Sequence, residues 1–480
     1  MNSRPAASPE LMDDLIRTLG AELGPDGVLT GDAVSTRSAG IWRSDAIAAP
    51  VIFRPANTEQ VAMVLRACNA AGQPVVTHGG LTGLVKGAIA TEQDVILSTE
   101  RLNAIETLSV VDRTMQVQAG VKLAEAQDRA ESEGLMLALD MGARGSCTLG
   151  GNAATNAGGN RVIRYGMTRD NVLGLEAVLA DGTVVSSLNG MLKNNAGYDL
   201  KQLFIGSEGT LGVITRLVLR LRTAWQSQNT ALVACQDFTA VTSLLRGLDV
   251  SLGGTLSAYE VLWQNYYKLV AGDNPPLSTD YPYYVLVEAL GADITADHER
   301  FLGAISAAID NKLVADAVVC KSGAEREALW QLRDNVDRTM DCGPVFIFDV
   351  SLRLSHMEAY VDTVLERLRA EWAGSDYHIW VFGHAGDGNL HFVCAMGDRE
   401  QATRDRVERA VYEPLAQIRG SVSGEHGIGL EKKRWLTTSR TPEEIALMQA
   451  LKQALDPRGI LNPNRVFDLS GANADASEDG

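Results

Sequence analysis

The sequence contains no C-x-x-C pair. Its six cysteines are scattered at positions 68, 147, 235, 320, 342 and 394 of a 480-residue chain. This spacing argues against an iron–sulfur cluster or a zinc ribbon. Dispersed cysteines are typical of buried thiols in a reducing compartment, and we expect that state here.

Long apolar runs and a secretory start are also missing. No stretch reaches the run of about 18 apolar residues that a membrane-spanning helix needs. The opening residues Met1–Ala7 lack the basic start and the apolar run of about 7–15 residues that mark a secretory signal. We expect no integral membrane span and a cytoplasmic protein, with peripheral attachment to the inner membrane as the alternative.

An excess of positive charge is absent as well. The formal net charge of −17 would repel nucleic acid and anionic membranes, so we expect neither as a partner. A hydrophobic content of 45% and a charged content of 21% fit a globular enzyme. At 480 residues the chain exceeds the usual size of a single core, which predicts two or three domains.

Two common phosphate-binding motifs are missing, because the chain has neither G-x-G-x-x-G nor G-x-x-x-x-G-K-[ST]. Three other glycine-rich segments occur at 77–87, 145–159 and 206–214. Glycine permits positive φ and lets successive N–H groups converge on an anion. Taken singly, the first and third segments are more often sets of tight turns. The second is a long ribbon of small residues whose polar groups must bond something, and a large cofactor would meet that demand.

The coarse pattern predicts α+β structure throughout. Residues 50–220 alternate apolar runs, glycine clusters and helical segments, with strands expected at 51–53 and 74–76 and a helix at 58–71. Residues 223–375 change character and suggest a separate α+β domain. Further helices are expected at 325–340 and 442–455.

The most informative segment is His384-Ala-Gly-Asp-Gly-Asn-Leu-His391, followed by Gly424-Glu425-His426-Gly427. Apolar runs flank the first loop, which predicts two strands joined as a hairpin with His384 and His391 facing each other. Side chains opposite each other across antiparallel strands have Cβ atoms about 4.5–5.5 Å apart, so both rings could bind one cation. Glu425 would be the third ligand of an open, catalytic type of site that suits zinc, manganese or ferrous iron.

Two other interpretations of these histidines stay open. A histidine in a glycine-rich loop often satisfies local backbone groups, although three of the seven histidines in two such loops argue against coincidence. A metal-dependent hydrolase would also use two histidines and a carboxylate, but it leaves the ribbon at 145–159 unexplained.

Taken together, these motifs resemble the vanillyl-alcohol oxidase flavoprotein superfamily, and within it the FAD-linked D-2-hydroxyacid dehydrogenases. The resemblance spans about residues 45–468, and further motifs that carry it are Lys193–Leu200, Ser423–Gly429 and Asn462-Pro463. It implies an α+β fold with a discontinuous FAD-binding domain at 1–222 and an inserted substrate, or cap, domain at 223–420. A segment at 421–470 would return to the FAD domain and complete the active site, and 471–480 would be a disordered tail.

The resemblance also implies which residues bind FAD. The set comprises Gly79, Gly80, Thr82 and Gly83 at the pyrophosphate, then Ser146, Gly150, Gly151, Thr155, Gly158, Gly212 and Ile214 at the adenosine and ring, and Asn462 near the isoalloxazine. Some relatives attach flavin covalently through a histidine just after the paired glycines. Here Leu81-Thr82 stands there and His78 precedes the glycines, so we expect noncovalent FAD.

The implied reaction oxidises a D-2-hydroxyacid such as D-lactate, D-2-hydroxyglutarate or D-malate. His384, His391 and Glu425 would hold one divalent metal, zinc being the first choice with manganese or iron as alternatives. His426 would be the base, or instead a fourth ligand or a partner of a ligand. Arg333 and Asn389 are assigned to substrate binding, although Arg333 on pattern alone would more often be a solvated charge.

Two positions depart from the 2-hydroxyglutarate branch. Ile347 stands where that branch has a lysine, and Val393 where it has an asparagine, which favours lactate or a longer apolar 2-hydroxyacid. The electrons would pass to an external quinone, cytochrome or electron-transfer flavoprotein, and a homodimer is an option. A subunit of a glycolate-oxidase complex and a flavoprotein of non-redox alkyl transfer are the alternatives within the superfamily.

Overall fold

The structure is a computed structural model that describes residues 9–469. The tail at 471–480, which we expect to be disordered, lies outside these residues. Among the residues that the structure describes, no helix combines the length and the apolar character needed to cross a membrane.

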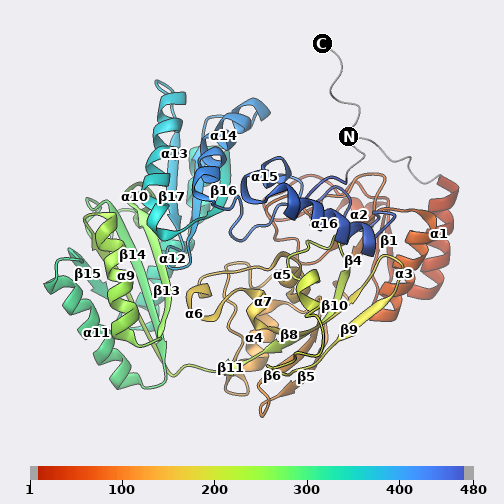
Figure 1. The fold of residues 1–480 in the computed structure, drawn as a ribbon, viewed down its shortest axis with the longest axis horizontal. Coiled ribbons are helices and arrows are strands. Elements are labelled where there is room, and N and C mark those ends of the chain that lie inside the picture. The colour runs from red at the N-terminus through yellow and green to blue at the C-terminus, as the bar shows by residue number, and fades with distance from the viewer. Residues whose placement is uncertain (1–8, 470–480) are drawn as a thin grey trace. The chain divides into compact units, whose positions relative to one another are not determined.

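The chain forms two compact units, which Figure 1 shows coloured by residue number. The flanking unit comprises residues up to 157, 167–224 and those from 426 onward. The central unit comprises 158–166 and 225–425. Sequence reasoning expected a change of domain at 222–223 and at 420–421, and it did not separate residues 158–166 from the rest of the segment 1–222.

One sheet of the flanking unit has four strands in the order β1-β2-β4-β3. They are β1 (Val28–Thr30), β2 (Val51–Phe53), β4 (Val95–Ser98) and β3 (Val75–His78). The pairs β2/β4 and β3/β4 are parallel. Helices α1 (Pro9–Leu23) and α3 (Thr58–Ala71) share a hydrophobic core with these strands. The predicted helix at 58–71 is confirmed; the Asn57 side chain caps its start, and Gly72 in the left-handed region ends it.

The other large sheet of this unit is antiparallel, with the order β5-β6-β10-β8-β9. Its strands are β5 (Ile105–Ser109), β6 (Thr114–Gln118), β10 (Val213–Arg220), β8 (Val172–Val178) and β9 (Val184–Ser187). The remaining elements are α2 (Asp32–Ser35), α4 (Leu123–Glu131), β7 (Leu135–Met136), α5 (Leu149–Thr155), α7 (Thr168–Asn171), α8 (Lys201–Phe204), β11 (Arg222–Thr223), η3 (Lys433–Trp435), α15 (Leu436–Ser439) and α16 (Pro442–Leu455). The predicted helix at 442–455 is confirmed by α16.

The central unit is built on an antiparallel sheet of seven strands, ordered β15-β12-β14-β13-β17-β18-β16. The strands are β12 (Ser227–Cys235), β13 (Leu256–Trp263), β14 (Tyr283–Gly291), β15 (Asp316–Val319), β16 (Val345–Ser351), β17 (His378–Gly383) and β18 (Asn389–Ala395). Every residue of β13 and of β18 is buried. Since successive side chains of a strand point to opposite faces, both faces of the sheet are covered at these strands.

Helices and short turns complete the central unit. They are α6 (Val162–Tyr165), α9 (Phe238–Leu252), α10 (Gln264–Ala271), α11 (Ile294–Asp310), α12 (Gly323–Asp334), η1 (Val336–Cys342), η2 (Leu354–His356), α13 (Met357–Glu371) and α14 (Gln401–Ile418). The predicted helix at 325–340 is wrong in its extent. The α-helix ends at Asp334, because Asn335 has a non-helical ψ of 49°, and the chain continues as a 3-10 turn.

Candidate active site

His384 and His391 lie at the hairpin of β17 and β18, but not opposite each other. Strand β17 ends at Gly383, and the residue opposite His391 is Phe382. His384 belongs to the turn, where its carbonyl oxygen accepts hydrogen bonds from the backbone N–H groups of Asp387 and Gly388. The predicted facing pair is therefore wrong in register. The two imidazoles are nevertheless diagonal neighbours, with ring centroids 5.4 Å apart.

Glu425 approaches the same two rings within the central unit. One ligand atom from each of His384, His391 and Glu425 lies within 4.8 Å of the other two. Glu425 Oε1 accepts a 2.6 Å hydrogen bond from the Gly159 backbone N–H, and Oε2 lies 3.7 Å from His384 Nε2. Two imidazole nitrogens and a carboxylate oxygen form a donor set that catalytic zinc sites use, and this set fits a divalent cation.

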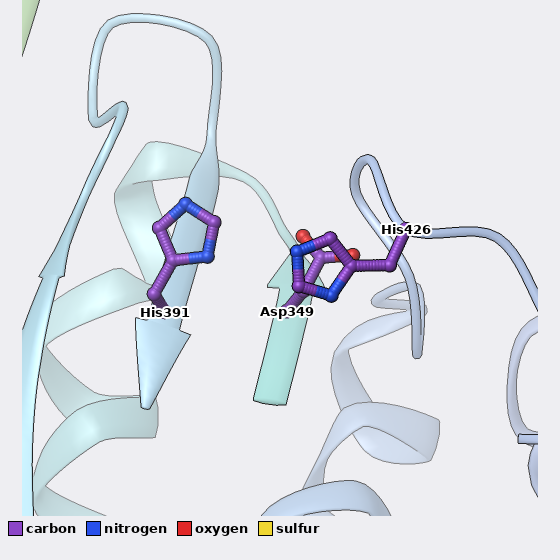
Figure 2. A group of neighbouring side chains, drawn as sticks. All are labelled: Asp349, His391 and His426. Carbon is purple, nitrogen blue, oxygen red and sulfur yellow. The ribbon is translucent and has the colours of Figure 1, made fainter. Parts of the chain in front are cut away.

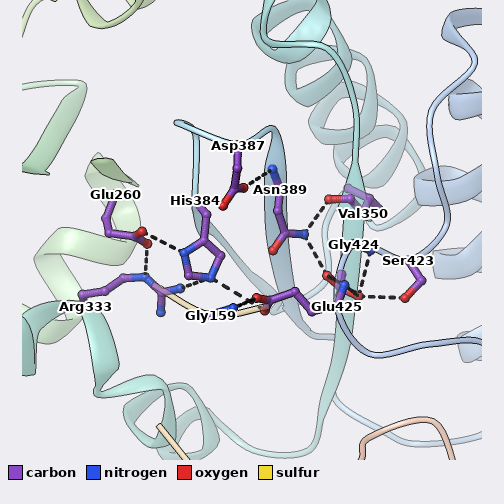
Figure 3. A network of polar contacts seen from close by, with 11 residues as sticks. Gly159, Glu260, Arg333, Val350, His384, Asp387, Asn389, Ser423, Gly424 and Glu425 are labelled. Carbon is purple, nitrogen blue, oxygen red and sulfur yellow. Dashed lines mark hydrogen bonds and ion pairs between the residues drawn. The ribbon is translucent and has the colours of Figure 1, made fainter. Parts of the chain in front are cut away.

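A buried glutamate, Glu260 on β13, binds both His384 and Arg333 (Figure 3). Its carboxylate oxygens lie 2.7 Å from His384 Nδ1 and 2.7 Å from Arg333 Nε. Arg333 Nη2 is 3.0 Å from His384 Nε2. Because a guanidinium can only donate, this contact fits a neutral His384 ring with its proton on Nδ1. A carboxylate that fixes this tautomer leaves the Nε2 lone pair as an acceptor, which Arg333 occupies here and a metal could take if Arg333 moved away.

Burial and neighbouring charges set the protonation of the cluster. Burial lowers the pKa of His391 to about 3, helped by the charges of His384 and Arg333, so this ring is neutral near pH 7. Burial opposes ionisation of Glu425, but the charge of His384 and the hydrogen bond to it lower the pKa of Glu425 to about 2. For His384, burial lowers the pKa, while the Glu260 carboxylate raises it and gives a net upward shift. A proton therefore competes with a metal for His384 Nε2.

Arg333, on α12, is buried rather than solvated, with 6% of its surface exposed. Its guanidinium stands 5.1 Å from the centroid of the Phe382 ring, and its charge is balanced by Glu260. The interpretation of Arg333 as a solvated helix-face charge is therefore wrong. Its place beside His384 is compatible with the predicted contact to substrate.

Asn389, the first residue of β18, has one polar atom still to be satisfied. Its Nδ2 donates to Asp349 Oδ1 and to the Val350 carbonyl oxygen, both at 2.8 Å. Its Oδ1 is buried and accepts no hydrogen bond from the described part of the chain. A buried acceptor without a donor is costly, so this atom is suited to a donor group of a ligand or a water.

Sequence reasoning missed Asp349, on β16, which is fully buried. Its carboxylate accepts hydrogen bonds from the backbone N–H groups of Gly424 and Glu425 and from the Ser423 hydroxyl. It thereby holds the Ser423–Glu425 loop against the sheet. The available signal was a lone acid inside an apolar strand, the same signal that marks Glu260.

His426 directly follows Glu425 and is the first residue of the last segment of the flanking unit. Figure 2 shows His391 and Asp349 on the neighbouring strands β18 and β16, and His426 in the loop after Glu425. Chain connectivity alone therefore keeps His426 next to a candidate metal ligand. Its role as a base stays a prediction.

The first glycine loop of the flanking unit lies directly against the ribbon at 145–159. A Cβ at Gly80 would lie 2.3 Å from the Ser146 carbonyl oxygen, and one at Gly79 would lie 2.8 Å from Thr148 Oγ1. A Cβ at Gly83 would meet no described atom within 4 Å. Internal packing therefore explains Gly79 and Gly80 without a cofactor, whereas open space at Gly83 leaves room for one.

Several other predicted FAD contacts also have internal partners. Gly150 packs against Ala119 and Gly212 against the Phe204 ring, while Ile214 is part of the core beneath the five-stranded sheet. The Thr155 hydroxyl donates to the Gly151 carbonyl oxygen at 3.1 Å. Their contact with FAD stays a prediction.

Gly158 does not belong to the flanking unit, which contains the ribbon residues up to 157. It belongs to the central unit, where a Cβ at this position would lie 2.8 Å from Glu425 Oε1. This placement gives Gly158 a role in admitting the Glu425 carboxylate. Its predicted contact with FAD has no support from this packing.

Asn462 joins the first and third glycine segments. Its Oδ1 accepts from the Thr77 backbone N–H at 2.8 Å, and its Nδ2 donates to the Glu208 carbonyl oxygen at 2.6 Å. The partly buried Glu208 carboxylate in turn accepts from the N–H groups of Ile428 and Gly429. The adjacent Thr77 Oγ1 is buried and has no partner among the described residues, which fits a bound polar cofactor at this point.

A cavity of about 350 Å³ lies in the flanking unit beside the first glycine loop. Its lining includes Arg43, Asp45, His78 and the residues 88–92. No predicted FAD contact lines it. Burial lowers the pKa of His78 to about 4, so a neutral imidazole borders this cavity near pH 7.

Two family models match the chain. Residues 49–187 match an FAD binding domain, and residues 225–466 match the C-terminal domain of FAD linked oxidases. The second match covers half of the chain and includes the histidine cluster. These matches support FAD as the cofactor.

Curated relatives are similar over most of their length. D-2-hydroxyglutarate dehydrogenase of Xanthomonas citri pv. viticola is 38% identical over 88% of this chain and 90% of its own. The mitochondrial enzyme of that name from Bos taurus is 40% identical over 87% of this chain and 76% of its own. A putative mitochondrial D-lactate dehydrogenase of Schizosaccharomyces pombe is 35% identical over 86% of this chain and 80% of its own.

Solved structures share the fold at low sequence identity. p-Cresol methylhydroxylase has a TM-score of 0.75 and 17% identity, covering 96% of this chain and 98% of its own. Alkyldihydroxyacetonephosphate synthase has a TM-score of 0.74 and 16% identity, covering 96% of this chain and 86% of its own. The predicted α+β fold of the vanillyl-alcohol oxidase type is confirmed. The chain belongs to the FAD-linked D-2-hydroxyacid dehydrogenase branch of the vanillyl-alcohol oxidase superfamily and is an FAD-dependent oxidoreductase.

Proposed function

We propose that this protein oxidises a D-2-hydroxyacid to the 2-oxoacid and passes the electrons to an external quinone, cytochrome or electron-transfer flavoprotein. The observation that carries the proposal is the cluster of His384, His391 and Glu425 beside Arg333, in a chain with an FAD binding domain. The names of the relatives, D-2-hydroxyglutarate and D-lactate dehydrogenases, support the same class of substrate.

The reaction must remove the hydroxyl proton and the Cα hydride. FAD, when bound, supplies the hydride acceptor at N5. The protein must then supply a base for the proton and positive charge for the carboxylate. We assign the proton to His426, because imidazole titrates near neutral pH and this residue adjoins the candidate ligand Glu425.

His384, His391 and Glu425 would hold a divalent cation, zinc being the first choice and manganese or iron the alternatives. Such a cation supplies a Lewis acid for the substrate oxygen. Glu260 keeps the His384 proton on Nδ1, and the Gly159 N–H holds one Glu425 oxygen in place. Arg333 Nη2 lies at 3.0 Å from His384 Nε2, so metal binding would require this group to shift.

Arg333 and Asn389 would orient the substrate. Glu260 uses Arg333 Nε, so the terminal nitrogens of the guanidinium are the groups that could bind the substrate carboxylate. Asn389 Oδ1 offers a buried acceptor to the substrate or to a water that accompanies it. Arg333 and Asn389 lie on different sides of His384 (Figure 3).

Location and assembly belong to the same proposal. We assign the protein to the cytoplasm, with peripheral attachment to the inner membrane as the alternative, while the Bos taurus relative carries a mitochondrial name. A homodimer is the proposed assembly. Fractionation and sedimentation would test these two assignments.

The experiment is anaerobic bleaching of the purified protein by D- and L-2-hydroxyacids, with and without a chelator. We expect an oxidised-flavin spectrum that bleaches with at least one D-isomer and not with its L-isomer. Loss of bleaching with chelator would support the metal. A flavin-containing protein that no 2-hydroxyacid reduces would overturn the proposed function.

A further inference from the structure

We infer that the substrate is a monocarboxylic 2-hydroxyacid with an apolar side chain, and that Ile347 excludes a second carboxylate. This inference rests on the proposed function and narrows its substrate class. It is carried by the arrangement of strands β16, β18 and β17 beside the histidine cluster.

The sheet face that carries His391 continues into an apolar surface. Asp349 and Phe382 are the cross-strand partners of His391, and two residues further along β18 the partners of Val393 are Ile347 and Trp380. Alternate residues of a strand share a face, so Val393 and its two partners follow His391 on its own side of the sheet. The Phe382 ring fills the corner, 5.3 Å from the His391 ring.

Ile347 is the exposed end of this surface. Val393 has no exposed area, and Trp380 is 4% exposed, whereas Ile347 is only partly buried. Of these three side chains, Ile347 is therefore the one that a group extending from the cluster along this face could contact. An isoleucine offers apolar contact and no hydrogen-bond donor.

The charged groups of the cluster are already engaged with other groups. Arg333 pairs with Glu260, and the carboxylates of Asp349 and Glu425 accept hydrogen bonds from the backbone N–H groups of Gly424 and Gly159. A distal carboxylate would add a further negative charge beside apolar side chains, which is unfavourable without a partner.

Other basic residues of the central unit are engaged in fixing its structure. Arg161 pairs with the buried Glu288 at 3.1 Å. Arg164 donates to the carbonyl oxygens of Thr255 and Leu290. The charge of Arg161 is therefore balanced by Glu288, and Arg164 Nη1 is held by two backbone oxygens.

The test compares the wild type with Ile347→Lys, and uses Ile347→Met as the matched apolar control. Anaerobic flavin reduction is measured with D-lactate, D-2-hydroxybutyrate, D-malate and D-2-hydroxyglutarate. We expect the wild type and Ile347→Met to favour the monocarboxylic acids, by roughly 10- to 100-fold in the second-order rate constant. Ile347→Lys should move this ratio toward the dicarboxylic acids by at least about 10-fold.

A binding measurement covers a variant that folds but turns over slowly. Perturbation of the flavin spectrum by 2-oxobutyrate and 2-oxoglutarate gives the affinity for each product, and Ile347→Lys should bind 2-oxoglutarate more tightly than the wild type does. A wild type that prefers dicarboxylic acids, or a lysine variant with an unchanged preference and unchanged affinities, would overturn the inference. Both results leave the proposed function intact, which fails only if no 2-hydroxyacid reduces the flavin.

Discussion

The central and flanking units use their diagnostic residues in different ways. In the central unit, charged and polar side chains bind one another at about hydrogen-bond distance around His384, and within residues 9–469 the buried Asn389 Oδ1 still has no partner. In the flanking unit, the predicted cofactor glycines largely meet other parts of the same unit, as Gly80 does at Ser146. A cluster of titratable groups therefore indicates chemistry directly, whereas a glycine-rich loop indicates close approach and leaves open what approaches.

The largest expected effect comes from removing a candidate metal ligand. His384→Ala should abolish flavin reduction and release the bound metal, because two ligands seldom retain a catalytic cation. Metal content by mass spectrometry and stopped-flow reduction measure the two effects. His378→Ala is the control, since His378 lies on the same hairpin with an exposed side chain. Metal retained at the wild-type ratio in His384→Ala would exclude His384 as a ligand.

Replacement of the proposed base should have the second largest effect on flavin reduction. His426→Ala should slow flavin reduction by about 10²- to 10⁴-fold, the usual contribution of general acid–base catalysis, while FAD stays bound. The pH dependence of the rate should lose its imidazole limb in the variant. Reduction kinetics equal to those of the wild type would remove His426 from the proposed mechanism.

Glu260→Gln should have a smaller effect, chiefly on the metal. Glutamine keeps the shape but not the charge that fixes the His384 tautomer and holds Arg333, so metal affinity should fall roughly 10- to 100-fold. Competition with a chromogenic chelator measures the affinity. Glu288→Gln is the matched control, because Glu288 is also buried and paired with an arginine but lies away from the histidines in the network. Equal losses of affinity in both variants would point to general destabilisation.

Two alanine variants test whether glycines of the flanking unit serve internal packing or FAD binding. Gly80→Ala should lower the free energy of unfolding by about 1–3 kcal/mol, because its Cβ would overlap backbone atoms of the ribbon. Gly83→Ala should leave the unfolding of the apoprotein within about 0.5 kcal/mol of the wild type. Denaturant unfolding of both apoproteins and FAD titration separate the two effects. If Gly83→Ala weakens FAD binding alone, the loop contacts the cofactor at that residue; unaffected affinity would count against this contact.

The sequence predicted the chemical components of the candidate site better than their arrangement. Histidines and a glutamate in glycine-rich loops are recognisable by residue type, and the structure brings His384, His391 and Glu425 together as the sequence predicted. The register was missed because Gly383 ends β17 early and moves His384 into the turn. Asp349 was missed because its partners at 423–425 lie more than 70 positions away along the chain, so only the folded sheet brings them together.

Local signals served well for isolated helices. The helix at 58–71 has the expected bounds because an amphipathic pattern lies between a capping residue and a left-handed glycine. The predicted helix at 325–340 is too long, because the same kind of sequence pattern continues past Asn335, where the backbone leaves the helical region. The departure of residues 158–166 into the central unit had no local signal, because it depends on Arg161 pairing with Glu288 and on Gly159 binding Glu425.

The central claim is that the central unit holds a divalent metal required for oxidation of the substrate. The most direct measurement is stopped-flow flavin reduction by a reactive D-2-hydroxyacid, before and after metal removal and after addition of one equivalent of zinc or manganese. We predict that the stripped protein keeps its FAD spectrum but is not reduced, and that one of the two metals restores the rate. Full-rate reduction of the metal-free protein would contradict the claim.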